Sequence, residues 1–353
     1  MGRTWLRLLP SLGSTVAGVN LDVVDLTAPL ARQVETMRRA CEELGFFRIP
    51  LDSIDRGIAD RAWEQAAAFF LLPTEEKTAI AFPEPGYPYG YSPFRFETLA
   101  RSTGDTVGPP DLKESLSVGP DCLASAVEAG NGETVAGDDL AGAAWIRSPS
   151  LWPEQLPGLR PAWEAYFQAL SEVAGELLSV MALALGLPAD YFEAMIDRPI
   201  TSMRAINYPE LPQSQPQGAL RAGAHSDYGT LTILRTDDIA GLEIQQPDGS
   251  WTDVSNEPDT FVVNLGDSIA QWTNDRWQST VHRVALTSTE QRQSFAFFHM
   301  ANWDAEIECL PTCRDGNEMP GHAPVLAGPW LMSKFQSTVT GRTRADRSVE
   351  MPS

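Results

Sequence analysis

Short apolar segments separated by turn residues follow one another from residue 201 to residue 299, and they constrain the fold more than any other feature of the chain. Residues 247–250, Pro-Asp-Gly-Ser, form a turn sequence typical of a β-hairpin. Short strands at such close spacing predict an antiparallel jelly roll, the double-stranded β-helix, whose mouth suits one metal ion and one small ligand. The predicted strands are 201–207, 220–225, 229–235, 241–246, 259–265, 279–286 and 292–299.

The first 200 residues are predicted to be mostly helical. Apolar residues recur at helical spacing from Thr27 to Leu44 and from Ser53, the expected cap, to about Leu72. The longest predicted helix covers residues 159–187. The fold class is therefore mixed α and β: a double-stranded β-helix core with flanking N-terminal helices and a C-terminal helix. Further predicted elements are strands at 16–25 and 46–49 and a closing helix at 330–339.

The chain is predicted to form a single domain over residues 1–340, followed by a flexible tail at 341–353. Within it we expect a mostly helical part at 1–200, the jelly-roll core at 201–300 and a closing segment at 301–340. Residues 82–157 lack periodicity, which is typical of a covering loop, with a mobile tip at 129–139. Its aromatic residues are expected to form a rim at the mouth of the barrel: Tyr87, Tyr89, Tyr91, Phe94 and Phe96.

The bulk composition limits the classes of partner. The chain has 353 residues, of which 43% are apolar, so global disorder is excluded. A formal charge of −21 disfavours nucleic acid and anionic membranes as partners. No apolar run is expected to span a bilayer, and the N-terminus lacks a convincing secretion signal, so we expect a cytoplasmic protein, with a monomer favoured. Cys309 and Cys313 lie in a Pro-containing loop as possible ligands or a bridge, but free thiols are expected.

Three side chains in the predicted barrel form a candidate metal site. His225 and Asp227 are two residues apart, so on an extended segment both point to the same side. A second imidazole, His282, follows several predicted strands later. Two imidazoles and one carboxylate on one face of an octahedron suit ferrous iron and leave the opposite face open.

A second polar pair follows on the last predicted strand. Arg292 offers a rigid fork suited to a carboxylate, and Ser294 lies on the same face of the strand. The other two histidines, His299 and His322, are interpreted as a strand-end residue and a loop residue that do not bind the metal.

These motifs together resemble the iron(II)/2-oxoglutarate-dependent dioxygenases, most of all their isopenicillin N synthase-like branch, whose core is a cupin-like jelly roll. The resemblance covers nearly the whole chain. It is carried by Cys41 to Phe47, Asp111 to Ser115, Arg204 to Pro209, Ala224 to Thr232, Gly241 to Ile244, Val263 to Asp267, Trp272 to Asp275, Thr280 to Val284, Arg292 to Phe295 and Trp330 to Lys334.

The resemblance implies a role for each motif. His225, Asp227 and His282 would bind Fe(II), and 2-oxoglutarate and O2 would be the co-substrates. The residues expected to hold the distal carboxylate of 2-oxoglutarate are Arg292, Ser294 and Tyr208. No catalytic residue beyond the metal ligands is required. Further expectations are that Asp267 is a structural turn carboxylate, that Arg204 or Asn207 lines the pocket, and that Trp272, Asn274 and Phe297 are pocket walls or plain core.

The expected activity is hydroxylation, desaturation or ring closure of a small-molecule metabolite, with release of succinate and CO2. Two alternatives stay open on the residues alone. Arg292 could instead bind a carboxylate of the substrate, as in a four-electron oxidase that uses Fe(II) and O2 without 2-oxoglutarate. A jelly roll that binds a ligand without turnover is the second alternative. The identity of the substrate is not encoded in the motifs.

Overall fold

The computed structural model describes residues 18–84, 86–99, 109–122, 140–212, 214–215, 218–314, 316 and 319–339. The helices are α1 (Leu30–Glu43), α2 (Arg56–Phe70), α3 (Thr74–Thr78), α5 (Leu140–Ile146), α6 (Leu159–Ala184), α7 (Glu193–Ile196), α8 (Asp267–Trp272) and α9 (Ala327–Val339). The strands are β1 (Phe46–Pro50), β2 (Gly90–Ser92), β3 (Glu114–Val118), β4 (Ser202–Tyr208), β5 (Ala222–His225), β6 (Leu231–Thr236), β7 (Leu242–Gln245), β8 (Trp251–Asp253), β9 (Thr260–Leu265), β10 (His282–Val284), β11 (Arg292–His299), β12 (Glu306–Ile307) and β13 (Val325–Leu326).

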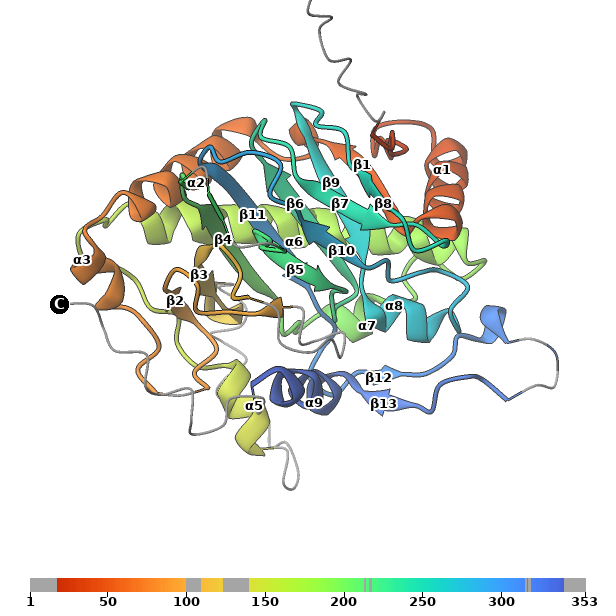
Figure 1. Ribbon diagram of the computed structural model, residues 1–353. Helices are drawn as coiled ribbons and strands as arrows, with labels where there is room; N and C mark the ends of the chain where they lie inside the picture. Colours follow the sequence, from red (N-terminus) through yellow and green to blue (C-terminus); the bar gives the residue numbers. More distant parts are fainter. Residues whose placement is uncertain are drawn as a thin grey trace, which may run out of the picture.

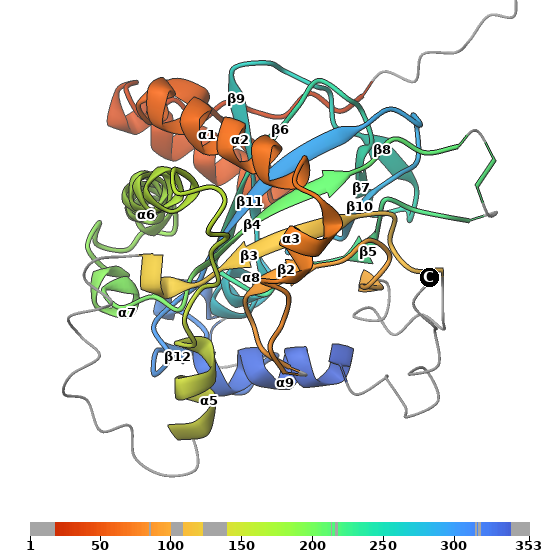
Figure 2. The same cartoon turned by 90° about the vertical axis from the view of Figure 1, so that its left-hand side faces the viewer.

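Two sheets make up the body of the fold. The larger has the strand order β1-β9-β6-β11-β4-β3-β2, and the smaller has the order β5-β10-β7-β8. The smaller sheet lies in front of the larger one in Figure 1, and α1, α2 and α6 lie on the far side of the larger sheet in Figure 2. Two antiparallel sheets with flanking helices are the arrangement expected of the predicted double-stranded β-helix fold.

Strand register gives the larger sheet two unlike faces. Arg292 pairs with Tyr208 and Ala296 pairs with Arg204, and register partners point to the same side of a sheet. On this side, which we call the inner face, Tyr208 packs with residues of β5 and β10 of the smaller sheet. Phe297, one position along β11 from Ala296, points the other way and lies 5.1 Å from Phe167 of α6, measured between ring centroids. The inner face is therefore the one that can hold a site.

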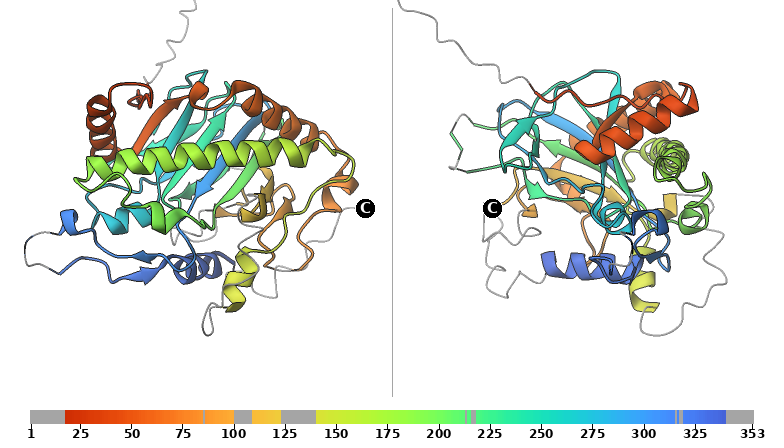
Figure 3. Two further views of the ribbon diagram at one scale, coloured as in Figure 1. Left: turned by 180° about the vertical axis from the view of Figure 1, so that it is seen from behind. Right: turned by 90° about the vertical axis from the view of Figure 1, so that its right-hand side faces the viewer.

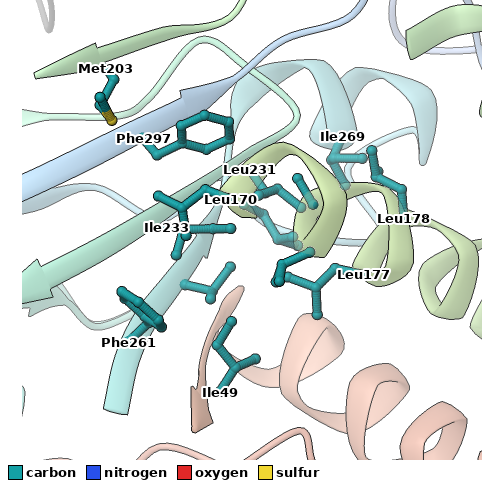
Figure 4. Close-up of a cluster of buried hydrophobic side chains, with 14 of the residues drawn as sticks. Ile49, Leu170, Leu177, Leu178, Met203, Leu231, Ile233, Phe261, Ile269 and Phe297 are labelled. Atoms are coloured by element: carbon teal, nitrogen blue, oxygen red, sulfur yellow. The ribbon is translucent and has the colours of Figure 1, made fainter. Parts of the chain in front are cut away.

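The main hydrophobic core fills the opposite side of the larger sheet. Figure 3 shows α6 running across this face, and Figure 4 shows the side chains that meet there. The contacts join strands far apart in the sequence to one helix, so this core holds the sheet rigid behind the site. The residues labelled in Figure 4 are Ile49, Leu170, Leu177, Leu178, Met203, Leu231, Ile233, Phe261, Ile269 and Phe297.

Helix α6 is the one described helix that is long and apolar enough to cross a membrane. By length and composition Leu159–Ala184 could cross a membrane, with a mean hydropathy of 1.3, although no such segment was predicted. Half of that apolar stretch is buried inside the protein, where it packs against the sheet and against α1 and α2. A helix that is apolar on most sides is typical of the core of a large domain, and α6 is such a core helix.

Regular structure inside residues 82–157 also departs from the prediction. β2 and β3 extend the larger sheet, and α5 packs against α9. Residues 129–139, the predicted mobile tip, lie outside the described residues. The segment therefore contributes part of the barrel wall as well as its covering.

Smaller differences between the predicted and the observed elements lie in the N-terminal third of the chain. Ser53 is not the cap of α2, because Asp55 accepts a hydrogen bond from the backbone N–H of Ile58 at 3.0 Å. The predicted strand at 16–25 is reduced to isolated bridges at Val19 and Val23 within its described part. Neither difference touches the inner face.

Candidate active site

The three predicted metal ligands converge between the two sheets. His225 and His282 face each other as register partners of β5 and β10, with ring centroids 4.4 Å apart. Asp227 follows β5, and its Oδ1 lies 3.9 Å from Nε2 of His225 and 4.0 Å from Nε2 of His282. One ligand atom from each residue lies within 4.8 Å of the others, so these residues could hold a metal ion. Within the described part of the chain, no other histidine belongs to such a group.

Backbone carbonyls orient both imidazoles. Nδ1 of His225 lies 2.8 Å from the carbonyl oxygen of Gly223, and Nδ1 of His282 lies 3.1 Å from that of Thr280. A carbonyl oxygen can only accept, so each Nδ1 carries the proton. Each Nε2 then has a lone pair directed toward the Asp227 carboxylate, which is the tautomer that a metal ligand needs.

Asp227 is oriented by two buried side chains that the sequence analysis missed. Its Oδ2 accepts hydrogen bonds from the hydroxyl of Thr232 and, at 2.8 Å, from the amide of Asn264. Thr232 and Asn264 are themselves register partners of β6 and β9 on the inner face. With Oδ2 bound on this side, Oδ1 is the oxygen that faces the two imidazoles. Asn264 could have been suspected as a lone amide in the apolar run Phe261–Leu265.

Burial and the short distances between the side chains shift the pKa values of His225 and Asp227. Burial, together with the neighbouring His282, lowers the pKa of His225 to about 3. Burial alone would raise the pKa of Asp227, but the two imidazoles and the hydrogen bonds from Asn264 and Thr232 outweigh it and hold this pKa below its usual value. The arrangement therefore favours a neutral imidazole beside an ionised carboxylate, the protonation states that bind a divalent cation.

The predicted carboxylate-binding residues meet on neighbouring strands. Arg292 of β11 and Tyr208 of β4 are register partners, and the guanidinium carbon lies 4.9 Å from the centre of the Tyr208 ring. Ser294 points to the same face two residues along and is buried. Arg292 Nε donates to the carbonyl oxygen of Ile239 at 3.1 Å, whereas its buried Nη1 has no hydrogen-bond partner among the described residues.

A second arginine supports this end of the site, and the sequence analysis missed it. Arg221 is 1% exposed and donates to the carbonyl oxygens of Tyr208, Ser288 and Glu290. Its guanidinium lies 5.8 Å from the Tyr208 ring centre, so two cations lie close to that ring. The positive charge here suits an anionic group.

The remaining predicted residues fall outside the metal group. His299 points to the helix-covered face, where Nδ1 lies 2.7 Å from the Thr230 hydroxyl, and the exposed His322 pairs with Asp275. Asp267 accepts a hydrogen bond from Ser279 and pairs with Lys334 of α9, as expected for a structural carboxylate. Trp272 and Phe297 are core residues. Of the two candidates for the pocket wall, Arg204 lies on the inner face, whereas Asn207 faces away from the site. The buried Cys309 and Cys313 are free thiols, as expected.

The predicted aromatic rim is wrong for two of its members. Tyr89 and Tyr91 are 2% and 3% exposed, and their hydroxyls bond to the Ile146 carbonyl and to the Glu114 carboxylate. Tyr91 lies on the strand face that packs against Phe69 of α2. Alternation along β2 turns it into the core, a direction that could not be assigned before the strand itself was known.

Comparisons with known proteins agree with this geometry. Residues 200–301 match the 2OG-Fe(II) oxygenase superfamily, and residues 21–155 match the N-terminal region of non-haem dioxygenases in morphine synthesis. A 2-oxoglutarate-Fe(II) type oxidoreductase of Emericella nidulans, hxnY, is 32% identical over 90% of this chain and 88% of its own. A homoarginine-6-hydroxylase of Oryza sativa subsp. japonica is 33% identical over 81% of this chain and 83% of its own.

Solved structures that superimpose on this chain indicate the same family. A full-length Neurospora crassa protein in complex with alpha-KG and thymine superimposes with a TM-score of 0.75 at 25% identity, over 92% of this chain and 98% of its own. A 2OG-Fe(II) oxygenase family protein of Caulobacter crescentus has a TM-score of 0.74 at 26% identity, over 90% and 98% of the two chains. The chain therefore belongs to the 2OG-Fe(II) oxygenase superfamily. It is a non-haem iron, 2-oxoglutarate-dependent dioxygenase that requires Fe(II), 2-oxoglutarate and O2, which decides against the two alternatives left open by the sequence.

Proposed function

We propose that His225, Asp227 and His282 are the iron ligands, through Nε2, Oδ1 and Nε2. Convergence of the three atoms within 4.8 Å is the observation that carries this assignment. The donor set suits ferrous iron, and a hydrogen bond to the other polar atom of each side chain fixes its direction. Three protein ligands on one side leave the remaining positions for 2-oxoglutarate and O2.

Arg292, Ser294 and Tyr208 bind the distal carboxylate of 2-oxoglutarate in this proposal. The unpartnered Nη1 of Arg292 supports the assignment, because a buried guanidinium nitrogen without a partner is costly unless a ligand satisfies it. A carboxylate there would accept from the planar fork, and the hydroxyls of Ser294 and Tyr208 lie on the same face of the sheet.

The reaction is the oxidation of a small-molecule metabolite by hydroxylation, desaturation or ring closure, with release of succinate and CO2. Iron, 2-oxoglutarate and O2 supply the oxidising power when bound, and the protein orients the substrate and excludes water. The names of the relatives support a small polar substrate: they include homoarginine and proline hydroxylases, and the Neurospora crassa protein is bound to thymine. A monomeric cytoplasmic enzyme with a single domain over residues 1–340 completes the proposal.

Iron stoichiometry tests the ligand assignment. Protein loaded with Fe(II) under anaerobic conditions and then desalted is expected to retain one iron per chain. His225→Ala should lose the iron while keeping its circular dichroism, whereas the exposed and remote His322→Ala serves as the matched control and should retain it. Full iron retention by His225→Ala would contradict the assignment.

A further inference from the structure

A cluster of four charged side chains lies on the inner face of the barrel and takes no part in holding iron or 2-oxoglutarate. Glu97 Oε2 lies 3.1 Å from Nζ of Lys113 and 3.1 Å from Nη1 of Arg204, and Lys113 also lies 3.7 Å from Asp111. Lys113 and Asp111 are each 3% exposed, measured on their side chains. Burying charged groups costs desolvation free energy, so the position of this cluster indicates a function.

The cluster adjoins the proposed iron site through the backbone. Asp111 Oδ1 accepts a hydrogen bond at 2.9 Å from the N–H of Gly223, and the carbonyl oxygen of Gly223 is the acceptor for Nδ1 of His225. Asp111 Oδ2 accepts from the N–H of Leu99, which packs against the apolar cluster that contains Tyr208 of the proposed 2-oxoglutarate site. The charged cluster therefore lies beside both halves of the proposed active site.

Small residues surround the Arg204 side chain on the inner face. Its register partners are Ser117 on β3 and Ala296 on β11, and Gly90 lies beyond Ser117 on β2. In the neighbouring row of the sheet, Ser115 has a buried hydroxyl with no hydrogen-bond partner among the described residues. The register partners of Arg204 are therefore small, and the unpartnered hydroxyl of Ser115 is a polar group that a ligand could satisfy.

Glu97 and Arg204 are the accessible members of the cluster. Their side chains are 21% and 24% exposed, in contrast to the fully enclosed Lys113 and Asp111. A ligand that opens the Glu97–Arg204 pair separates a carboxylate from a guanidinium, so it must itself bring one positive and one negative group to satisfy both. A simple carboxylate would leave Glu97 competing with it for Arg204.

We propose, on the basis of the proposed iron and 2-oxoglutarate site, that Arg204 and Glu97 recognise the substrate and that the substrate is a zwitterionic amino acid. The fork of Arg204 binds its carboxylate, and the carboxylate of Glu97 binds its ammonium group. Lys113 and Asp111 hold Glu97 in place, and Ser115 and Ser117 line the adjacent space. The side chain of the amino acid then extends toward the iron.

Ligand titration under anaerobic conditions tests this inference without depending on turnover. The protein is loaded with Fe(II) and 2-oxoglutarate, and the visible band of the chelated keto acid is followed while the twenty standard L-amino acids and homoarginine are added in turn. At least one of them is expected to perturb the band. Its desamino acid and its decarboxylated amine should each bind at least about tenfold more weakly, because each lacks one charge-assisted contact.

Variants tie the binding to the two residues. Arg204→Gln and Glu97→Gln should each weaken the binding of that amino acid by about tenfold to a hundredfold, and Arg204→Lys should fall between wild type and Arg204→Gln. Arg160→Gln, at an exposed pair on α6, is the matched control and should bind normally.

Three results would overturn the inference: no amino acid of the panel perturbs the band, the desamino acid or thymine binds as tightly as the amino acid, or Arg204→Gln and Glu97→Gln bind it normally. A wild-type protein that shows no band before any amino acid is added would instead contradict the proposed iron and 2-oxoglutarate site.

Discussion

Each proposed iron ligand uses one polar atom for the metal and another for the protein. The imidazoles of His225 and His282 donate from Nδ1 to backbone carbonyls, and Asp227 accepts on Oδ2 from Thr232 and Asn264. The ligand types and their spacing were predictable because the chemistry of ferrous iron demands them. The partners of Asp227 were not, because they depend on the register between β6 and β9.

Removing a partner of Asp227 should weaken the iron site without unfolding the protein. Asn264→Ala is expected to lower Fe(II) affinity by about tenfold to a hundredfold, because the carboxylate loses an orienting donor. Competition with a chelator measures this affinity. Asn256→Ala, which changes an exposed asparagine on the surface, is the control and should leave the affinity unaltered. Equal affinities in the two variants would mean that Asn264 does not orient the ligand.

Arg292→Lys should not be tolerated as a conservative change. Lysine keeps the positive charge but lacks the planar fork, so we expect the KM for 2-oxoglutarate to rise at least about tenfold. Succinate formation at varied 2-oxoglutarate concentration measures it. Arg39→Lys alters an exposed arginine paired with Asp22 and should behave as wild type. An unchanged KM in Arg292→Lys would remove Arg292 from the co-substrate site.

At the scale of elements, seven of the eight strands within residues 201–299 were predicted within a few residues, since apolar alternation and turn residues mark them directly, whereas β8 was not predicted. β2 and β3 were missed for a physical reason. In β3 the polar Ser115 and Ser117 alternate with the buried Leu116 and Val118, but the strand has only five residues and its sequence neighbours are rich in Pro and Gly. So short an alternation inside an irregular stretch is a weak signal for a sequence prediction.

The backbone segments at Gly229 and Gly266 cross in close contact, two residues after the proposed iron ligand Asp227. A Cβ at Gly266 would lie 2.2 Å from the carbonyl oxygen of Gly229, and Ser268 N–H donates to that same oxygen. Gly266→Ala should therefore destabilise the protein by more than about 2 kcal/mol, because a backbone atom must move.

The matched control for this crossing is Gly175→Ala in α6, where a Cβ would meet nothing within 4 Å. It should stabilise the protein by about 0.5–1 kcal/mol, since alanine loses less entropy than glycine in a helix. Urea unfolding of both variants measures the two changes. A Gly266→Ala protein as stable as wild type would show that the two segments separate more easily than the structure indicates.

At the scale of the whole molecule, acid stability is predicted to depend on His299. Burial lowers the pKa of this imidazole to about 4, against an ordinary value of 6.5. Between these two values the unfolded chain binds a proton that the folded protein does not, so the free energy of unfolding falls as pH decreases from 6.5 to 4 and is unaffected by this group above 6.5.

His299→Gln should flatten that decline. A pKa difference of roughly 2.5 units corresponds to at most about 3 kcal/mol at pH 4. Urea unfolding at pH 7, 5.5 and 4 is expected to show a smaller loss of stability in the variant than in wild type. Parallel losses in both proteins would show that His299 is protonated in the folded state. The exposed His322→Gln is the control and should decline with wild type.

Some features of the whole molecule can be predicted from local sequence, and others are determined only by tertiary packing. The class of fold, the proposed iron ligands and the proposed carboxylate-binding residues follow local rules of spacing and donor chemistry. The buried direction of Tyr91, the proximity of Arg221 and Arg292 to Tyr208, and the charged cluster at Glu97 and Arg204 depend on contacts between segments distant in sequence. The proposed substrate site depends on those contacts, so the substrate could not be predicted from motifs.

Formation of the ternary complex with iron and 2-oxoglutarate tests the assignment of the site most directly. Wild-type protein titrated anaerobically with Fe(II) in the presence of 2-oxoglutarate is predicted to develop the visible charge-transfer band of a chelated keto acid, saturating at one iron per chain. Asp227→Ala should show no band at the same concentrations. Absence of the band from the wild type, or a band of equal intensity in Asp227→Ala, would contradict the proposed iron site.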